Sequence, residues 1–116
     1  MRILFTVSVC VLLFTLPALP QDGPKKINQH DALEAVAHRV APEYPPIARQ
    51  LKIQGVVEVE AEIGEDGSVE RVKAVSGSPV LTKAAGDALM KWKFKPFTEA
   101  GKPIKVVSTL SFNFNL

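Results

Sequence analysis

The sequence predicts an α+β domain of two layers, a three-stranded antiparallel sheet with two helices packed on one of its faces. Apolar and acidic residues alternate from Val57 to Ile63, and an Asp-Gly pair separates this run from a second extended segment. A longer alternation, from Ile104 to Leu116, ends the chain. Two segments with helical spacing of apolar residues, each beginning near a proline, precede the first and the last of these strands.

The first 20 residues are set apart by their composition. Arg2 precedes an apolar run, Ile3 to Leu16, that is shorter than the ~20 residues a transmembrane helix needs. Residues 1–20 are therefore predicted as a signal peptide, or as a short signal-anchor if they are not cleaved. Cys10, the one cysteine of the chain, lies in this leader, so the remainder has no thiol or disulfide chemistry.

Residues 21–39 are predicted as a tether or N-terminal extension, because their first part is polar and contains a Gly-Pro pair. Residues 31–40 fit both the spacing of a helix and the alternation of a strand, and we favour a short strand or extended segment that ends at Pro42. The domain itself is expected to occupy residues 40–116.

The first helix is expected to begin at Pro45-Pro46, since the missing N–H of proline has no partner in a first turn anyway. Gly55 is expected to end it. Its apolar face is formed by Ile47, Ala48 and Leu51. So short a helix persists only by docking that face on the rest of the domain.

The Asp66-Gly67 pair is a strong hairpin signal. The return strand, Ser68 to Val75, changes its alternation midway, which predicts a β-bulge near Glu70-Arg71. Arg71 and Lys73 are then expected to face the glutamates of the first strand, as weak pairs that mark the register.

The second helix is expected to have Ser78 as its N-cap, a proline in its first turn and an apolar stripe that ends at Trp92. Gly86 in the middle of the helix indicates a close approach to the sheet. The segment from Lys93 to Phe97 is expected to be extended. A turn at Gly101 to Pro103 then leads into the last strand.

Enzymatic chemistry needs a nucleophile, an acid–base pair or a metal cluster, and the sequence after the leader suggests none of these. Its only histidines are His30 and His38, and the two acids in the Gly64–Gly67 turn are too few for a calcium loop. A net charge of +2 made of mixed signs argues against a grip on nucleic acid. We therefore expect no enzyme activity, cofactor, metal, small-molecule substrate or nucleic-acid partner.

Five short motifs occur in order: Tyr44-Pro45-Pro46-Ile47-Ala48-Arg49, Gly55-Val56-Val57, Asp66-Gly67-Ser68-Val69, Val75-Ser76-Gly77 and Trp92-Lys93-Phe94-Lys95-Pro96. Each is weak alone, but together and at these spacings they resemble the TonB C-terminal domain family over residues 40–116. The residues that carry the resemblance are Tyr44, Pro45, Ala48, Gly55, Asp66, Gly67, Trp92, Phe94 and Pro96.

The resemblance implies a periplasmic module in TonB-dependent transmembrane transport. Members of this family grip the TonB box, a peptide segment of outer-membrane receptors, by adding it as a strand to the edge of their last strand. Coupling to the ExbB/ExbD motor is implied only if the leader is retained as an anchor. The family's proline-rich spacer has no counterpart between residues 20 and 40, and Ala41 stands where members often have a glutamine. These two departures bear on pulling and leave the expectation of binding unchanged; whether energy is transduced stays open.

The residues themselves also favour a binding edge. A three-stranded sheet has free edges, and the last strand carries few of the charges that usually protect such an edge. The residues expected to meet a partner strand are Lys105, Val107, Thr109, Ser111, Asn113 and Asn115. Two other interpretations stay open: the strand is central, or the segment at 31–40 covers it.

The alternative function uses the same edge without energy transduction. In that interpretation the chain is an exported structural domain that self-associates as a homodimer or binds another envelope partner.

Overall fold

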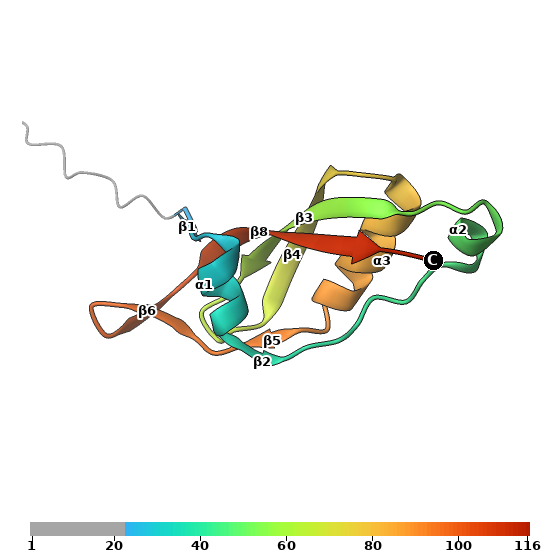
Figure 1. Cartoon of the computed structure of the whole chain (residues 1–116). Helices are drawn as coiled ribbons and strands as arrows, with labels where there is room; N and C mark the ends of the chain where they lie inside the picture. Colours follow the sequence, from blue (N-terminus) through green and yellow to red (C-terminus); the bar gives the residue numbers. More distant parts are fainter. Residues whose placement is uncertain (1–22) are drawn as a thin grey trace, which may run out of the picture.

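The computed structural model describes residues 23–116, and the predicted leader lies outside them (Figure 1). The elements are β1 (Lys25–Lys26), α1 (Gln29–Glu34), β2 (Val36–His38), α2 (Pro46–Gln50), β3 (Gly55–Ile63), β4 (Val69–Ser76), α3 (Pro79–Leu89), β5 (Lys93–Phe94), β6 (Phe97–Glu99), β7 (Lys102–Ile104) and β8 (Val106–Phe114). Helices combined with a mainly antiparallel sheet confirm the predicted α+β class. None of the helices in this part of the chain is long and apolar enough to cross a membrane.

The main sheet has four strands in the order β1–β8–β3–β4, so the predicted count of three is wrong. β3 pairs antiparallel with β4 and β8, and its ladder with β8 runs unbroken from Gly55 opposite Phe114 to Ile63 opposite Val106. The additional strand is β1, which pairs parallel with the start of β8. A strand of two residues shows no alternation, so periodicity could not indicate it.

The core lies between β3, β8 and α3. The inward residues of β3 are all buried, as the alternation predicts: Val57, Val59, Ala61 and Ile63. α3 packs across β3 and β4 and buries Leu81 and Leu89 (Figure 1). A Cβ added at Gly86 would lie 3.2 Å from Cγ2 of Val72, which confirms the close approach of this helix to the sheet.

α2 begins as predicted, with Pro45 as N-cap and Pro46 in the first turn, but it is shorter than expected. Of its predicted apolar face only Ala48 is buried, whereas Ile47 and Leu51 are 50% and 63% exposed. Figure 1 shows α2 beyond the end of the sheet, near the C-terminus. A helix of five residues in that position presents only one narrow side to the domain, so the prediction of a three-residue docked face is wrong.

The expectation of an extended segment over residues 31–40 is wrong for its first part, where α1 makes a third helix. Asn28 caps this helix by accepting a 2.8 Å hydrogen bond from the N–H of Asp31, and Ala32 is fully buried. β2 follows and pairs antiparallel with β5. Asn28 precedes residues 31–40, the segment whose apolar spacing fits both a helix and a strand. Without the cap, the spacing within that segment favours the wrong element.

The β3–β4 hairpin forms at Asp66-Gly67, as predicted. The register shifts where Glu62 faces Arg71 and Ile63 faces Val69, so the expected bulge is confirmed at Glu70.

The predicted last strand is divided. Lys102–Ile104 is β7, which forms a hairpin with β6 before β8 begins at Val106. The turn of that hairpin lies at Ala100 and Gly101, with φ of 51° and 78°, rather than at Gly101 to Pro103. Pro103 lies within a strand opposite Thr98, a position that proline tolerates at a sheet edge.

Candidate partner-binding edge

The backbone of β8 shows which of its residues face the outer edge of the sheet. The carbonyl oxygens of Lys105 and Val107 accept 3.0 Å hydrogen bonds from the N–H groups of Lys25 and Ile27, so both point away from β3. Backbone groups of successive residues point to opposite edges, and the register of β8 with β3 is continuous. By the same alternation, the backbone N–H and C=O groups of Thr109, Ser111 and Asn113 also point to the outer edge.

The six predicted partner-strand residues are not equivalent in the structure. Lys105 precedes β8 and Asn115 follows it. Val107 is buried, and its carbonyl is bonded to Ile27. The other three lie beyond the reach of β1, in residues 109–113, which we call the open segment of β8.

The middle of the open segment is capped by a side chain that the sequence analysis did not single out. The N–H of Ser111 donates a 3.3 Å hydrogen bond to Oε1 of Gln29, at the start of α1. The edge of β8 is therefore partly covered. One of the interpretations left open was that residues 31–40 cover it. The covering residues are instead 25–29 together with α1, which lies beside β8. The Asn28 cap predicts a helix start, but nothing in the sequence places that helix beside β8.

A cleft of about 310 Å³ borders the open segment. Its walls include Leu33, Trp92, Leu110 and Phe112, and Arg39, Ala41 and Ser111 also line it. Side chains of an added strand alternate between the two faces of the sheet. A residue of the added strand that lies opposite Leu110 or Phe112 has its side chain on the same face as theirs, and would enter this cleft.

The opposite edge of the sheet, β4, is built differently. Two register shifts interrupt its pairing with β3, and the charged side chains of Glu70, Arg71 and Lys73 are exposed along it. Bulges and charges are devices that prevent unwanted strand pairing. The open segment of β8 has a continuous register and no charged residue, so it is the better surface for an added strand.

The residues that carry the family resemblance hold the framework around this edge. The hydroxyl of Tyr44 donates to the carbonyl of Ile53, and its ring meets that of Phe114 edge-on, with 5.7 Å between centroids. The guanidinium of Arg49 lies 5.3 Å from the Tyr44 ring. Tyr44 thereby ties α2 and the start of β3 to the end of β8. Pro96, by contrast, is exposed between β5 and β6.

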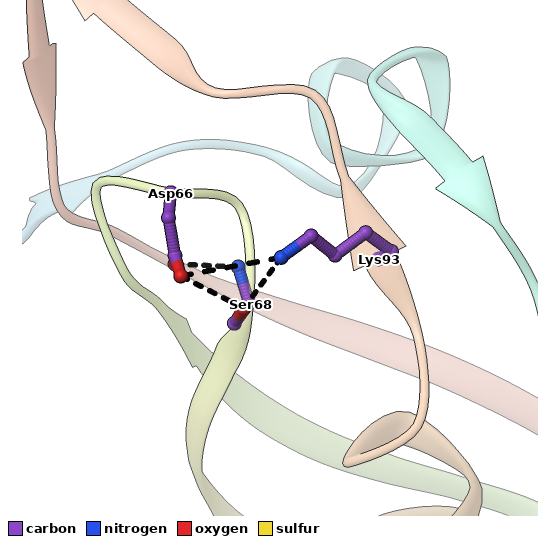
Figure 2. A network of polar contacts seen from close by, with 3 residues as sticks. All are labelled: Asp66, Ser68 and Lys93. Atoms are coloured by element: carbon purple, nitrogen blue, oxygen red, sulfur yellow. Dashed lines mark hydrogen bonds and ion pairs between the residues drawn. The ribbon is translucent and has the colours of Figure 1, made fainter.

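The Asp66-Gly67 turn is docked on β5. The carboxylate of Asp66 accepts hydrogen bonds from the N–H and the hydroxyl of Ser68, at 3.0 and 3.1 Å, and Nζ of Lys93 donates to the same hydroxyl at 2.7 Å (Figure 2). The Ser68 N–H, then its hydroxyl and the nearby Lys93 charge, lower the pKa of Asp66. The carbonyl of Gly67 accepts a 2.9 Å hydrogen bond from the N–H of Phe94, so the turn and β5 are fixed together.

Trp92 connects this framework to the cleft. It is buried, and its ring lies 5.8 Å from that of Phe112 and 6.0 Å from that of Phe94. The guanidinium of Arg39 lies 5.0 Å from the Trp92 ring centroid, within the range of a cation–π contact. One family-motif residue therefore forms a wall of the cleft beside β8.

The site offers backbone N–H and C=O groups next to an apolar cleft, which is the chemistry of peptide recognition. Between residues 23 and 116, no three His, Cys, Asp or Glu side chains are grouped as a metal ion would need. Of the two histidines in this range, His30 pairs with Glu34 at 3.1 Å on the exposed surface of α1.

Comparison with known proteins gives one consistent result. The family model described as Gram-negative bacterial TonB protein C-terminal matches residues 40–116. Protein TonB of Escherichia coli (strain K12) is 31% identical in an alignment of 80 residues, and the match covers 66% of this chain and 32% of that protein. Protein TonB of Salmonella typhimurium is 36% identical in an alignment of 67 residues, and the match covers 56% of this chain and 26% of that protein. The chain thus spans about a third or less of the length of these relatives.

The fold has a counterpart of known structure. The solution NMR structure of Pseudomonas aeruginosa TonB CTD matches with a TM-score of 0.59 and 26% sequence identity, over 70% of this chain and 84% of that chain. Sequence and fold therefore agree with the resemblance that the five motifs predict.

Proposed function

The chain belongs to the family of Gram-negative bacterial TonB C-terminal domains, and we propose that it binds peptide segments of outer-membrane receptors by adding them as a strand to β8. The bound segment, the TonB box, would lie along residues 109–113. The proposal places the module in the periplasm and in TonB-dependent transport. The observation that carries it is the orientation of the β8 backbone, whose groups at Thr109, Ser111 and Asn113 face away from β3.

Backbone pairing alone would make this a weak site. Each hydrogen bond contributes only about 0.5–1.5 kcal/mol to binding, because it replaces hydrogen bonds to water. The loss of conformational entropy when a free peptide becomes ordered opposes this contribution. Three residues offer few such bonds. A tight partner therefore needs at least one side chain that adds apolar burial.

The cleft next to Leu110 and Phe112 supplies that burial. A Val, Leu or Ile side chain that enters it between Leu33 and Phe112 gains about 1.5–3 kcal/mol if it becomes fully buried. We therefore propose that the partner segment carries a branched apolar residue directed to the core-facing side of β8. The residues that flank it point to the opposite face of the sheet, toward Glu58 and Glu60 on β3.

Amide chemical shifts test the proposal. The full chain, isotope-labelled and held in a mild detergent because of its apolar leader, is titrated with a synthetic TonB-box peptide. We expect shifts at the amides of residues 109–113 and at Gln29, with the amides of β4 as the internal control. Absence of shifts along β8 at millimolar peptide contradicts the proposal.

The same experiment separates the alternative function. A second copy could add to the same edge, since pairing through backbone groups needs no particular sequence. Shifts at residues 109–113 that depend on protein concentration, without any response to peptide, would favour self-association over receptor binding.

A further inference from the structure

Residues 25–29, here named the N-terminal strap, lie on the edge that we assign to the receptor segment. They precede residues 40–116, which the family model matches. The strap is therefore a feature of this chain outside the matched family domain, and its position on β8 needs its own explanation.

The strap uses the same backbone groups that an added strand would use. It donates from Lys25 to the carbonyl of Lys105 and from Ile27 to the carbonyl of Val107, both at 3.0 Å. Gln29 then accepts from the N–H of Ser111. An added strand longer than the open segment, or one that pairs at Ser111, cannot form while these bonds are in place.

The two ends of the strap region are held unequally. Downstream, Ala32 is fully buried and the carbonyl of Ala35 accepts a 2.7 Å hydrogen bond from the N–H of Lys95. Upstream, both residues of β1 are exposed, and the Lys25–Glu99 ion pair, at 3.5 Å between exposed side chains, adds little. Between the two ends, Ile27 is partly buried against the core, so release of the strap exposes this one apolar side chain. The strap can therefore leave β8 while the rest of α1, after Gln29, stays docked.

We infer that the strap is an internal competitor for β8, and that a receptor segment binds fully only after residues 25–29 have been displaced. This inference rests on the proposed function. Because the strap is tethered through α1, it is always present at high effective concentration. Only molecules with a released strap bind the segment fully, so the apparent Kd equals the intrinsic Kd divided by the fraction of such molecules.

A pair of proline variants tests the competition. Ile27→Pro removes the N–H that bonds to Val107 and should release the strap. Lys26→Pro is the matched control, because alternation directs the Lys26 N–H away from β8. In the full chain in detergent, we expect Ile27→Pro to bind a labelled TonB-box peptide about tenfold more tightly, with Lys26→Pro within about twofold of the unmodified chain.

A second measurement needs no variant. Hydrogen exchange at the amides of Lys25 and Ile27 should accelerate when the peptide saturates the unmodified chain, because their acceptors on β8 are then taken. Exchange at the amides of β3 and β4 is the control for global unfolding.

The outcomes separate the inference from the proposed function. Tighter binding by Ile27→Pro together with faster exchange at Lys25 and Ile27 supports the inference. Peptide binding to β8 with equal affinity in both variants, and with the strap amides still protected, overturns the inference and leaves the proposed function standing. Failure of the peptide to bind β8 even in Ile27→Pro overturns the proposed function, and the inference with it.

Discussion

The indole N–H of Trp92 donates a 2.7 Å hydrogen bond to the backbone carbonyl of Val40. Trp92 is only 5% exposed, so its N–H needs a partner within the protein. Val40 is the first residue of the family match, and Trp92 follows α3. One side chain thus fastens the beginning of the domain to its helix and forms a wall of the cleft.

Truncation of Trp92 should therefore destabilise the whole domain. We expect Trp92→Ala to lower the free energy of unfolding by about 3–5 kcal/mol, through loss of a buried aromatic side chain. Trp92→Phe retains a ring but leaves the Val40 carbonyl unpaired, and should cost about 1–3 kcal/mol. Urea denaturation followed by circular dichroism measures both. An unchanged midpoint for Trp92→Ala would show that the side chain is not part of the core.

Hydrophobic alternation suffices to locate β3 and most of β8, because each has nine residues and the inward side chains of β3 are buried throughout. It does not show the break after Ile104 that separates β7 from β8. It fails for β1, where two exposed lysines pair through backbone groups that any residue provides. It also fails for α1, whose start is set by the Asn28 cap rather than by a long apolar stripe.

For the candidate site, the sequence predicts the strand but not which part of its edge is free. Alternation identifies the side chains of β8 that face the core, but the free edge depends on strand order, which tertiary pairing decides. The Gln29–Ser111 hydrogen bond joins residues far apart in the chain, and no local signal relates them. The extent of the open segment therefore became visible only in the structure.

Gly67 should not tolerate a side chain. Its φ is +85°, and a Cβ there would overlap the carbonyl oxygen of Phe94 on β5. We expect Gly67→Ala to cost about 2–4 kcal/mol, since both the backbone conformation and the docking of the turn are disturbed. Gly101→Ala is the matched control, because φ there is +78° but nothing lies within 4 Å of the added Cβ. It should cost only about 1–2 kcal/mol, and equal losses in thermal denaturation would refute the steric explanation.

Asp66 should make a small contribution to stability that depends on pH. Its folded-state pKa lies below the ordinary value of 3.8, chiefly because the Ser68 N–H bonds to the carboxylate. As the pH falls, Asp66 is protonated in the unfolded chain before it is protonated in the folded one. Its contribution to stability is therefore fully present above the unfolded-state pKa and is lost as the pH falls through the folded-state pKa. We expect Asp66→Asn to be less stable than the unmodified chain at about pH 6, with the difference shrinking below about pH 4. Glu65→Gln, outside the network of Figure 2, is the control and should show no such convergence.

A proline at position 109 should separate partner binding from folding. The Thr109 N–H faces the outer edge, so Thr109→Pro should cost the fold at most about 1 kcal/mol while lowering the affinity for a TonB-box peptide about tenfold. Ser108→Pro is the matched control, because Ser108 lies opposite Ala61 and its N–H faces β3. That substitution should destabilise the domain by about 3 kcal/mol. Thermal denaturation and peptide titration of the two variants measure both effects.

If Thr109→Pro unfolds the domain as Ser108→Pro does, the orientation assigned to the β8 backbone is wrong. If it leaves peptide affinity unchanged, the receptor segment does not pair at this edge.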